Sequence, residues 1–514
     1  MKKILLGFAA SIAMFMSSCD MDTKNYGVLD QESSIENVQD AKSFLNGIYT
    51  QLRGISSGAY TAYGEMQMDQ FVATVDFGNR IGPFSTSQIT SSDTDIADMY
   101  YAAYMVANYA NFFLPRVDAL IESEEVSEAE KVELRYYNGV AHFARAYAYW
   151  WLFDKFVFYK ESNLNTEGTG LQIVTEYSPS ADRATYVGRS SLKATIDFIN
   201  GELATAYSAI RDYEQNVSIE YCKPNASRIN SYAVAALQAR FALQTNDYAT
   251  AKAKAEEVIN CGKFELTSIE DYEDMWVYDE GSELIFVPFA DNGQGYTTIG
   301  RNWYSDNQEN KSDYIPTASV LASYGKGDVR FDAFFSLYEM TISGGKYYGF
   351  AFTKYPGNPD LNSTASNGNR QKAKPFRLSE QYLIAAEACA VDGATKDEAK
   401  ANSYLNELRS NRIEDYTSMT YSGTALLNAV KAERAKELIG EGLRMGDLRR
   451  WGNGFTRVAQ FEALGSPFDA ISEVIVNSTN NVTYQPADNH FVWPIPFREM
   501  QVNPNLAGQQ NPGY

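Results

Sequence analysis

The chain has 514 residues, enough for several ordinary domains or for one large helical body with insertions. Its formal net charge is −21 and no basic stripe alternates with aromatic residues, so nucleic acid is disfavoured as a partner. No Walker, dinucleotide-binding or zinc-ligand pattern occurs, and His142 and His490 are the only histidines. We therefore expect no metal, no cofactor and no nucleotide.

The first residues have the organisation of a secretory leader. Lys2 and Lys3 precede an apolar run, and small residues come before Cys19. The run is shorter than the roughly 18 residues that a membrane span needs. A leader that ends on a cysteine resembles a bacterial lipoprotein leader, in which the thiol is acylated and becomes the mature N-terminus. An ordinary secretory signal with an incidental cysteine is the alternative.

Helical periodicity recurs along the chain in pairs. Residues 227–262 form the clearest pair, because two apolar stripes flank a turn at Asn246 and Asp247, and the unit of about 36 residues is close to the tetratricopeptide period. Residues 379–412 repeat this order, with Thr395 or Asp397 as the cap of the second helix. Two earlier pairs fit if each contains an insertion. The expected helices are Val38–Arg53, Asp95–Ile121, Arg135–Phe156, Ser190–Ile210, the two of 227–262 and the two of 379–412. Four such pairs predict a stacked superhelix.

Two long stretches lack this periodicity. Residues 54–93 are rich in Gly, Ser, Thr and aromatic residues and are too long for a simple turn, and 263–375 show helical spacing only around 318–324. Within the second stretch, SELIFVPFA predicts a strand, and Tyr272 and Trp276 are interpreted as core. Residues 291–313 form a polar loop that contains several aromatic residues. Trp303 in so polar a setting needs an explanation.

A charged segment, KAERAKELIGEGLRMGDLRRWG, predicts a third helix after the fourth pair. Glu433, Glu437 and Glu441 recur four apart on one side, and aliphatic residues line the other, so we expect the charges to face outward. We interpret its charged residues as structural, because ion-pair networks imitate active-site clusters. The residues concerned are Glu433, Arg434, Glu437, Arg444, Asp447 and Arg450.

Several segments together resemble one family. RLSEQYLIAAEA, LNELRSNR and AERAKELIGEGLRMGDLRRWG resemble the C-terminal half of the SusD/RagB family of outer-membrane nutrient-binding lipoproteins of Bacteroidetes, and ARAYAYW and the tail from WPIPFREM to QQNPGY extend the likeness. The resemblance implies a mostly α fold: a tetratricopeptide-like superhelix of four helix pairs with long insertions and little β-structure on the ligand-binding side. We expect a signal peptide at 1–18, a lipid-anchored tether at 19–34 and one SusD-like domain at 35–514. Its helix pairs are expected at about 38–121, 135–210, 227–262 and 379–412, and its ligand-side insertions at about 54–93, 263–375 and 453–490.

The resemblance also implies a function. Such proteins bind oligosaccharide at the cell surface and deliver it to a TonB-dependent outer-membrane transporter of the SusC type, without catalysis. The protein is expected to be anchored through Cys19, outside the cell. Sugar rings present C–H faces to aromatic rings and hydroxyls to planar polar groups. The expected ligand-binding residues are Trp303, Tyr304, Arg301, Asn302, Tyr296, Arg80, Asn79, Phe84 and Tyr63.

Other functions stay open at this point. A RagB-like lid that captures peptides is the main alternative within the binding class. A glycoside hydrolase would need two carboxylates at about 5 to 9.5 Å, and a chain with 65 acidic residues brings some pair that close. A structural tetratricopeptide adaptor fits the helices but not the leader or the aromatic insertions.

Overall fold

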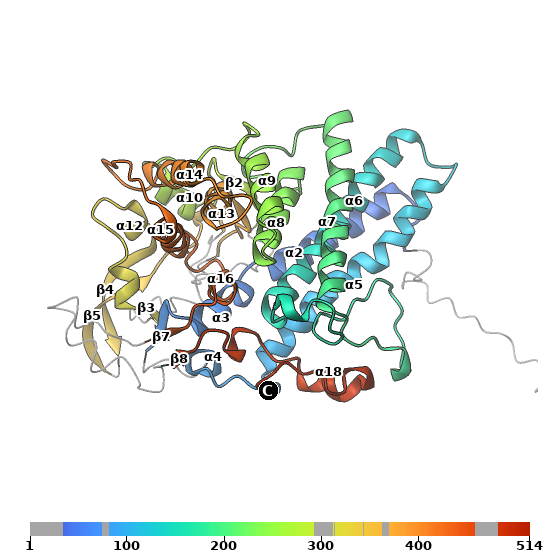
Figure 1. Cartoon of the computed structure of the whole chain (residues 1–514). Coiled ribbons are helices and arrows are strands. Elements are labelled where there is room, and N and C mark those ends of the chain that lie inside the picture. The colour runs from blue at the N-terminus through green and yellow to red at the C-terminus, as the bar shows by residue number, and fades with distance from the viewer. Residues whose placement is uncertain are drawn as a thin grey trace, which may run out of the picture.

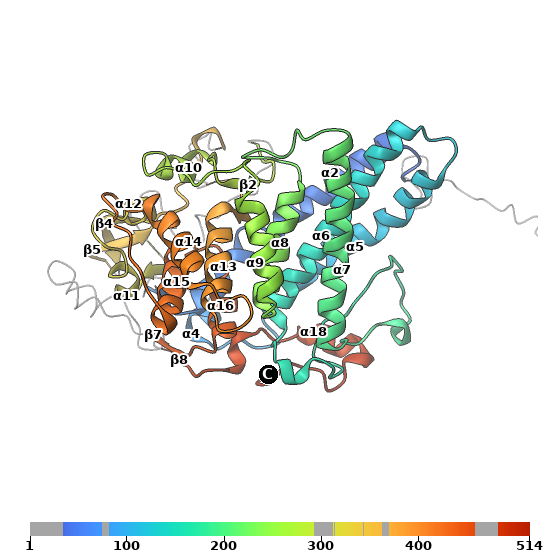
Figure 2. The same ribbon diagram turned by 45° about the horizontal axis from the view of Figure 1, so that its top comes forward.

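The structure is a computed structural model of the chain, and it describes residues 34–74, 82–291, 312, 314–342, 344–361, 370–457 and 482–514. Helices make up most of it, and the strands are short and lie in two-stranded sheets. Figure 1 shows the helices passing from α5, α6 and α7 on one side through α8 and α9 to α13, α14 and α15 on the other. The strands β4, β5, β7 and β8 gather at the far end of this row in both views (Figures 1 and 2), and Figure 1 shows β3 beside them.

The first half of the chain forms the long helices. These are α2 Val38–Ile55, α3 Ala59–Gln67, α4 Gly82–Thr86, α5 Thr94–Glu122, α6 Glu128–Phe156 and α7 Leu192–Asn216. The second half has more and shorter helices. These are α8 Ser231–Gln244, α9 Tyr248–Ile259, α10 Tyr272–Tyr278, α11 Ala318–Leu321, α12 Val329–Phe334, α13 Leu378–Ala390, α14 Glu398–Ser410, α15 Gly423–Glu437, α16 Arg444–Trp451 and α18 Phe497–Val502.

The four predicted helix pairs are confirmed. Helix α2 packs on α5, α6 on α7, α8 on α9 and α13 on α14, and each pair also packs on the next. Asn246 takes a left-handed conformation (φ 61°) at the predicted turn, and the Asp247 carboxylate caps α9 by accepting from the Thr250 N–H. Asp397 caps α14 in the same way. The apolar stripes are therefore buried between neighbouring pairs, as a stacked superhelix requires.

The stretch 54–93 is not one irregular loop. Helix α3 and strand β1 (Phe71–Ala73) occupy its first half, and α4 lies in its second. Met66 and Gln67 of α3 are fully buried. Periodicity did not reveal α3 because residues on most of its turns are enclosed, so no polar face alternates with an apolar one.

The stretch 263–375 is also more ordered than its pattern predicts. Strand β2 (Leu284–Phe286) lies inside the predicted strand SELIFVPFA and pairs with β6 (Phe376–Arg377), while β4 (Phe335–Ile342) and β5 (Gly345–Phe352) form an antiparallel hairpin. Tyr272 and Trp276 of α10 are 0% and 1% exposed, which confirms that they belong to the core.

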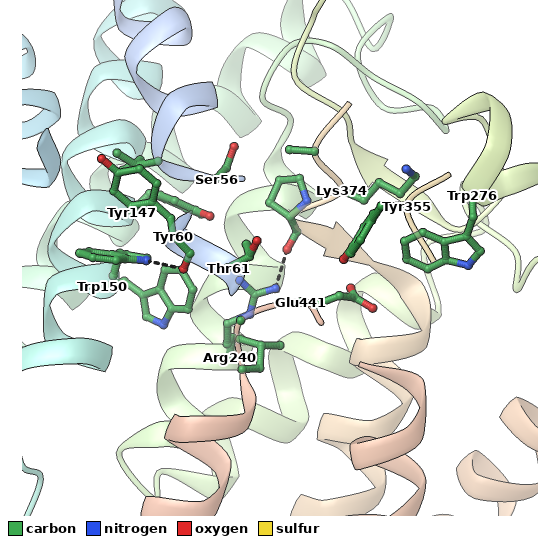
Figure 3. A pocket seen from close by; sticks show the side chains of 16 residues that line it. Ser56, Tyr60, Thr61, Tyr147, Trp150, Arg240, Trp276, Tyr355, Lys374 and Glu441 are labelled. Atoms are coloured by element: carbon green, nitrogen blue, oxygen red, sulfur yellow. Dashed lines mark hydrogen bonds between the residues drawn. The ribbon is translucent and has the colours of Figure 1, made fainter. Parts of the chain in front are cut away.

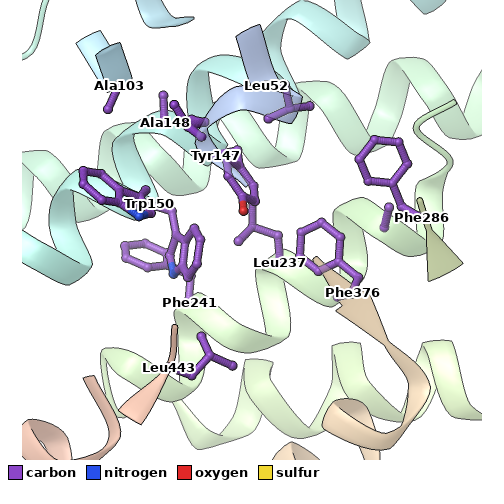
Figure 4. Close-up of a cluster of buried hydrophobic side chains, with 14 of the residues drawn as sticks. Leu52, Ala103, Tyr147, Ala148, Trp150, Leu237, Phe241, Phe286, Phe376 and Leu443 are labelled. Carbon is purple, nitrogen blue, oxygen red and sulfur yellow. The ribbon is translucent and has the colours of Figure 1, made fainter. Parts of the chain in front are cut away.

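The main core lies where the superhelix meets the β2–β6 sheet. Figure 4 shows Tyr147 and Trp150 of α6 facing Leu237 and Phe241 of α8, with Phe376 beside them. The rings of Tyr147 and Phe376 meet edge to face, with centroids 6.1 Å apart. This contact joins the helical body to the insertion side, so the two pack as one hydrophobic unit.

The charged segment forms two helices where one was predicted. Helix α15 ends at Glu437 and α16 begins at Arg444, and Gly440 and Gly442 lie between them with φ of +79° and +86°. Both glycines are required, since a Cβ on Gly440 would lie 2.7 Å from the Phe352 ring and one on Gly442 would lie 2.9 Å from the Thr61 backbone. The chain turns sharply here because it passes closely between two other segments.

The expectation that the charges of this segment face outward is wrong. Glu433 and Glu437 are 0% exposed, and each lies among arginines from distant parts of the chain. The Glu437 carboxylate accepts from Arg377 Nη1 at 2.8 Å and from Arg330 Nη1 and Arg412 Nε at 3.1 Å. We call this cluster the buried ion network; it comprises Glu283, Asp328, Arg330, Lys354, Arg377, Arg409, Arg412, Glu433, Lys436, Glu437 and Glu441. Its members are paired with opposite charges, which agrees with a structural role.

Candidate ligand-binding site

Two of the predicted insertions meet at one small sheet. Strand β1 pairs antiparallel with β3 (Tyr314–Pro316), so that Ala73 lies opposite Tyr314. Just beyond this pair the Thr74 hydroxyl donates to the Ser312 carbonyl at 2.9 Å. Residues 75–81 therefore begin where residues 292–311 end, although more than 200 positions separate them in sequence. Both strands are buried, which fixes the two ends rigidly.

A third insertion is held against the same place. Strands β7 (Phe455–Arg457) and β8 (Val482–Tyr484) pair antiparallel and flank residues 458–481. The buried Arg457 guanidinium donates to the carbonyls of Met66 at 2.9 Å and Met68 at 2.8 Å, just before β1, and also to that of Ser85. One side chain thus joins β7 to both sides of residues 75–81. Sequence periodicity could not single out Arg457, because it lies in an unpatterned segment.

Tyr484 completes this junction from the other strand of the hairpin. Its hydroxyl accepts from the Gln67 side-chain amide at 2.8 Å and shares a hydrogen bond with Ser87 at 2.5 Å. Gln67 Oε1 in turn accepts from the Trp493 indole at 2.8 Å. We call the β1–β3 sheet, the β7–β8 hairpin and α4 the insertion junction. Such a rigid base presenting several loops is the usual construction of a binding surface.

Most of the predicted ligand residues are not among those that the structure describes. Trp303, Tyr304, Arg301, Asn302, Tyr296, Arg80 and Asn79 are outside the described residues, as is the predicted lipidation site Cys19. Their roles stay predictions. The structure places the ends of the two segments that contain the seven ligand residues side by side at the insertion junction.

Two predicted ligand residues are described, of which one is buried and the other half-buried. Phe84 of α4 is 0% exposed, and its ring meets Trp493 edge to face with centroids 5.5 Å apart. Tyr63 of α3 is half-buried, with its ring centroid 4.9 Å from that of Phe84. In this arrangement Phe84 supports α4 from the core and offers no face to a ligand. The glycine and serine residues around Phe84 in the sequence suggested a loop, whereas Phe84 lies on the short helix α4 with its side chain in the core.

A small cavity lies between the helical body and the insertion side. Figure 3 shows Tyr147, Trp150 and Arg240 on one side of it and Trp276, Lys374 and Glu441 on the other. Its volume of about 40 Å³ holds a few water molecules and is too small for a sugar ring. Arg240 crosses the gap by donating to the Pro375 carbonyl at 2.5 Å. The cavity is therefore part of the packing.

A wider groove of about 710 Å³ runs along the outer side of α5. Aromatic residues dominate it, and Met105 is 51% exposed. The rings come from α2, α5 and the segment between α6 and α7; they are Phe44, Tyr101, Tyr104, Tyr109, Phe112 and Tyr177. An exposed apolar area of this kind is more typical of an interaction site than of an ordinary protein surface.

The described residues show little that would support metal or acid–base chemistry. No group of three or more His, Cys, Asp or Glu side chains within them is arranged to hold a metal ion. The carboxylates of the buried ion network are enclosed by arginines, and Arg330, Lys436 and Arg409 hold the pKa of Glu433 at about 2 although burial alone would raise it. A carboxylate that is charged and fully paired is a poor general acid. In the described part of the chain no helix is long and apolar enough to cross a membrane.

Comparisons with known proteins agree with this architecture. Residues 296–514 match the model of the SusD family, and residues 21–243 match a model described as starch-binding, associating with the outer membrane. No curated protein sequence matches the chain. The two models together span most of the sequence.

Solved structures resemble the whole fold. A SusD superfamily protein from Bacteroides thetaiotaomicron has a TM-score of 0.75 at 24% identity, covering 93% of this chain and 100% of its own. A surface glycan-binding protein A from Bacteroides fluxus has a TM-score of 0.67 at 21% identity, covering 93% and 99%. A laminarin-binding SusD-like protein has a TM-score of 0.64 at 20% identity, covering 93% and 100%. At these identities the likeness establishes the fold and no more.

Proposed function

This chain belongs to the SusD family, and from that premise we propose that it captures an oligosaccharide at the cell surface and delivers it to a SusC-like TonB-dependent transporter in the outer membrane. The observation that carries the proposal is the insertion junction, where the ends of residues 75–81 and 292–311 lie side by side on a rigid base. Arg80 and Trp303 belong to these two segments. The glycan- and laminarin-binding descriptions of two structural neighbours support a carbohydrate ligand.

The chemistry of the two segments suits a sugar. Trp303 and Tyr304 provide aromatic faces for the C–H side of a pyranose ring, and Arg301, Asn302, Asn79 and Arg80 provide planar hydrogen-bonding groups for its hydroxyls. A binding surface of this kind holds its ligand without chemical change, so we propose no catalytic residue.

The test of the site is Trp303→Ala. A stacked ring contributes about 0.5–1.5 kcal/mol beyond its buried area, so we expect a loss of affinity of about tenfold or more. The melting temperature is expected to stay that of the wild type. The contrast variant is Trp151→Ala, whose 3% exposed indole packs in the core and donates to the Tyr60 carbonyl at 3.2 Å, and whose loss is expected to cost about 3–5 kcal/mol of folding stability. Calorimetric titration over a panel of glycans and peptides, with melts of both variants, measures this. Binding of peptides alone would favour the RagB-like alternative, and a sharp loss of stability in Trp303→Ala with normal binding would refute the site.

The anchor is proposed to be an acylated Cys19, since acyl chains in combination hold a protein stably at a membrane. Fatty-acid labelling of the wild type and of Cys19→Ala in the native host measures this, and equal label in both would refute it. Protease treatment of intact cells tests the outward orientation, which complete protection would contradict.

The transporter is proposed to contact the helical pairs. Affinity purification from native membranes in mild detergent tests this partner: we expect a much larger β-barrel protein to copurify with the chain. Recovery of the chain alone would contradict the complex. Incubation of the purified protein with polysaccharides tests the absence of catalysis, and the appearance of shorter products would favour the hydrolase alternative.

A further inference from the structure

A second hollow, outside the insertion junction, combines an exposed ring with a cation that has no acidic partner among the described residues. It has a volume of about 420 Å³ and is lined by residues from three segments: α2, the turn before α8 and the stretch after β2. Phe289, which is 57% exposed, and Arg228 both line it. We call this hollow the Arg228 pocket; it is formed by Asn46, Tyr49, Thr50, Arg53, Ser227, Arg228, Pro288 and Phe289.

The charge of the pocket is opposite to that of the protein. Two of its lining residues are arginines and none is acidic, in a chain whose net charge is −21. Within the described residues the Arg228 guanidinium forms no ion pair with a carboxylate. The guanidinium instead lies over the face of Tyr49, 4.8 Å from the ring centroid. The described arginines of the buried ion network, by contrast, each have a carboxylate partner.

Both sides of the pocket are held in place. The Tyr49 hydroxyl accepts from the Ile229 N–H at 3.0 Å, so the ring under Arg228 is tied to the residue that follows it. On the other side Arg53 Nη1 donates to the Phe289 carbonyl at 2.6 Å, which fixes the backbone that presents the exposed ring. A site whose groups are already positioned loses less entropy when a ligand binds.

These groups match one chemical class of ligand. An exposed aromatic ring accepts the C–H face of a pyranose, the Asn46 and Thr50 side chains reach hydroxyls, and a guanidinium binds a planar carboxylate through two parallel hydrogen bonds. From this arrangement we propose that the Arg228 pocket binds an acidic sugar residue, one that carries a carboxylate or a sulfate ester, within an otherwise neutral oligosaccharide. A long polyanion is excluded because the rest of the protein repels it. This inference rests on the proposed function, and it names the ligand class more narrowly.

The experiment uses matched sets of three short oligosaccharides that differ in a single group. In each set the first member is a neutral xylo-oligosaccharide, the second is the same chain with one glucuronate, and the third is the same chain with one sulfate ester. For the wild-type protein we expect calorimetric titration to give about tenfold or tighter binding of an acidic member over its neutral counterpart, because a hydrogen bond to a charged group is stronger than one to a neutral group. The glucuronate and sulfate members identify the acidic group concerned.

Three variants assign the preference to the pocket. Arg228→Gln is expected to abolish the acidic preference, and Arg228→Lys to restore part of it, because lysine keeps the charge but not the planar fork. Phe289→Ala is expected to weaken the neutral and acidic members equally. Arg183→Gln, which removes an exposed arginine outside the pocket, is the control for net charge and is expected to leave the preference unchanged. Thermal melts of each variant confirm that it folds.

The outcomes separate this inference from the proposed function. If oligosaccharides bind and Trp303→Ala weakens them, but acidic and neutral members bind equally, the inference is overturned and the proposed function stands. An acidic preference that persists in folded Arg228→Gln also overturns it. If the wild type binds no oligosaccharide of a broad panel, both fall together.

Discussion

Two regions of this molecule bury polar groups by opposite means. On the side of α5 and α6, neutral tyrosine hydroxyls hold the segment between α6 and α7: Tyr100 donates to the Gln172 side chain at 2.5 Å, and the Tyr149 hydroxyl accepts from the Val174 N–H at 2.7 Å. Around α15 the buried groups are ionic, and Glu437 alone contacts three arginines. The first region resembles an aromatic core with hydroxyls at its edge, and the second is a lattice of charges.

The two regions differ in how far apart in the sequence their interacting residues lie. The hydroxyl contacts join α5 and α6 to the segment between α6 and α7, over separations of 72 and 25 residues. The ion network instead joins residues up to 129 positions apart, such as Glu283 and Arg412. A neutral hydroxyl that loses its partner costs about 1–3 kcal/mol, whereas a buried charge that loses its partner costs more. We therefore expect substitutions in the buried ion network to lower the stability more than substitutions of the tyrosine hydroxyls. The network also holds the insertion side in place.

The largest loss of stability is expected from Glu437→Ala. Removing this carboxylate leaves Arg330, Arg377 and Arg412 with one fewer partner in a region closed to solvent. We expect a loss of about 3–5 kcal/mol in the free energy of unfolding, measured by chemical denaturation. Glu407→Ala, on the exposed side of α14, is the matched control and is expected to change stability by about 0.5 kcal/mol or less. Equal effects of the two substitutions would contradict the role given to burial.

Acid should weaken the ionic region before the aromatic one. Burial would raise the pKa of Glu433, but Arg330, Lys436 and Arg409 lower it from 4.5 to about 2. The stability that this group contributes is fully present above pH 4.5 and is lost as the pH falls through 2, and it amounts to about 3 kcal/mol. The pKa of Glu437 and that of Glu441 are also lowered against the effect of burial, so their contributions have the same sign.

The measurement is the unfolding free energy at a series of pH values from 7 to 2, for the wild type and for Glu433→Gln. The wild type is expected to lose stability steeply below pH 4.5, and the variant, which starts from a lower stability, is expected to lose less over the same range. Parallel curves for the two proteins would show that Glu433 titrates normally.

Glu65 has the opposite pH dependence. Burial raises its pKa to about 6 despite its two backbone hydrogen bonds, so its contribution to stability is lost as the pH rises through 6.

The helical half of the fold follows from the sequence because its information is local. Apolar residues at three and four positions apart, with Asp247 and Asp397 as caps, predict the pairs 227–262 and 379–412 within a few residues. The ionic region does not follow, because Glu433 and Glu437 have the spacing of a solvated face until Arg330, Arg377 and Arg412 are placed beside them by tertiary structure. The spacing of charged residues along the chain does not show which distant residues they pair with in the fold.

The candidate site divides in the same way. Composition predicts the segments around Arg80 and Trp303 as ligand-binding, and this stays a prediction. The pairing of β1 with β3 brings their ends together, which no local pattern could show. Phe84 was misjudged because a short helix among glycine and serine has the composition of a loop. Arg228 and Phe289 were missed because each is unremarkable alone, and only the fold places them around one pocket.

A smaller effect is expected from Tyr149→Phe on the aromatic side. The substitution keeps the ring, whose edge-to-face contact with Phe198 has a centroid distance of 4.8 Å, and removes only the hydroxyl that accepts from the Val174 N–H. We expect a loss of about 1–2 kcal/mol, because one buried N–H is left without its acceptor. Tyr186→Phe is the control, since its hydroxyl bonds an exposed carbonyl that water also reaches. Thermal denaturation measures both, and a loss as large as that of Glu437→Ala would remove the distinction between the two regions.

The smallest effect is expected where an ion pair has the chemistry of the network without its burial. Lys193 and Asp197 lie four residues apart on α7 with 2.5 Å between Nζ and Oδ2, a distance as short as any in the network, yet their side chains are 57% and 59% exposed. Water solvates both charges when the pair separates, so Lys193→Ala is expected to cost about 0.5 kcal/mol or less, and less still in 1 M salt. Chemical denaturation at low and high salt measures this beside Glu437→Ala, whose cost should hardly depend on salt because ions do not reach the buried groups. If Lys193→Ala were as costly as Glu437→Ala, distance rather than burial would decide the strength of an ion pair here, and the contrast between the two regions would have to be explained by contact geometry alone.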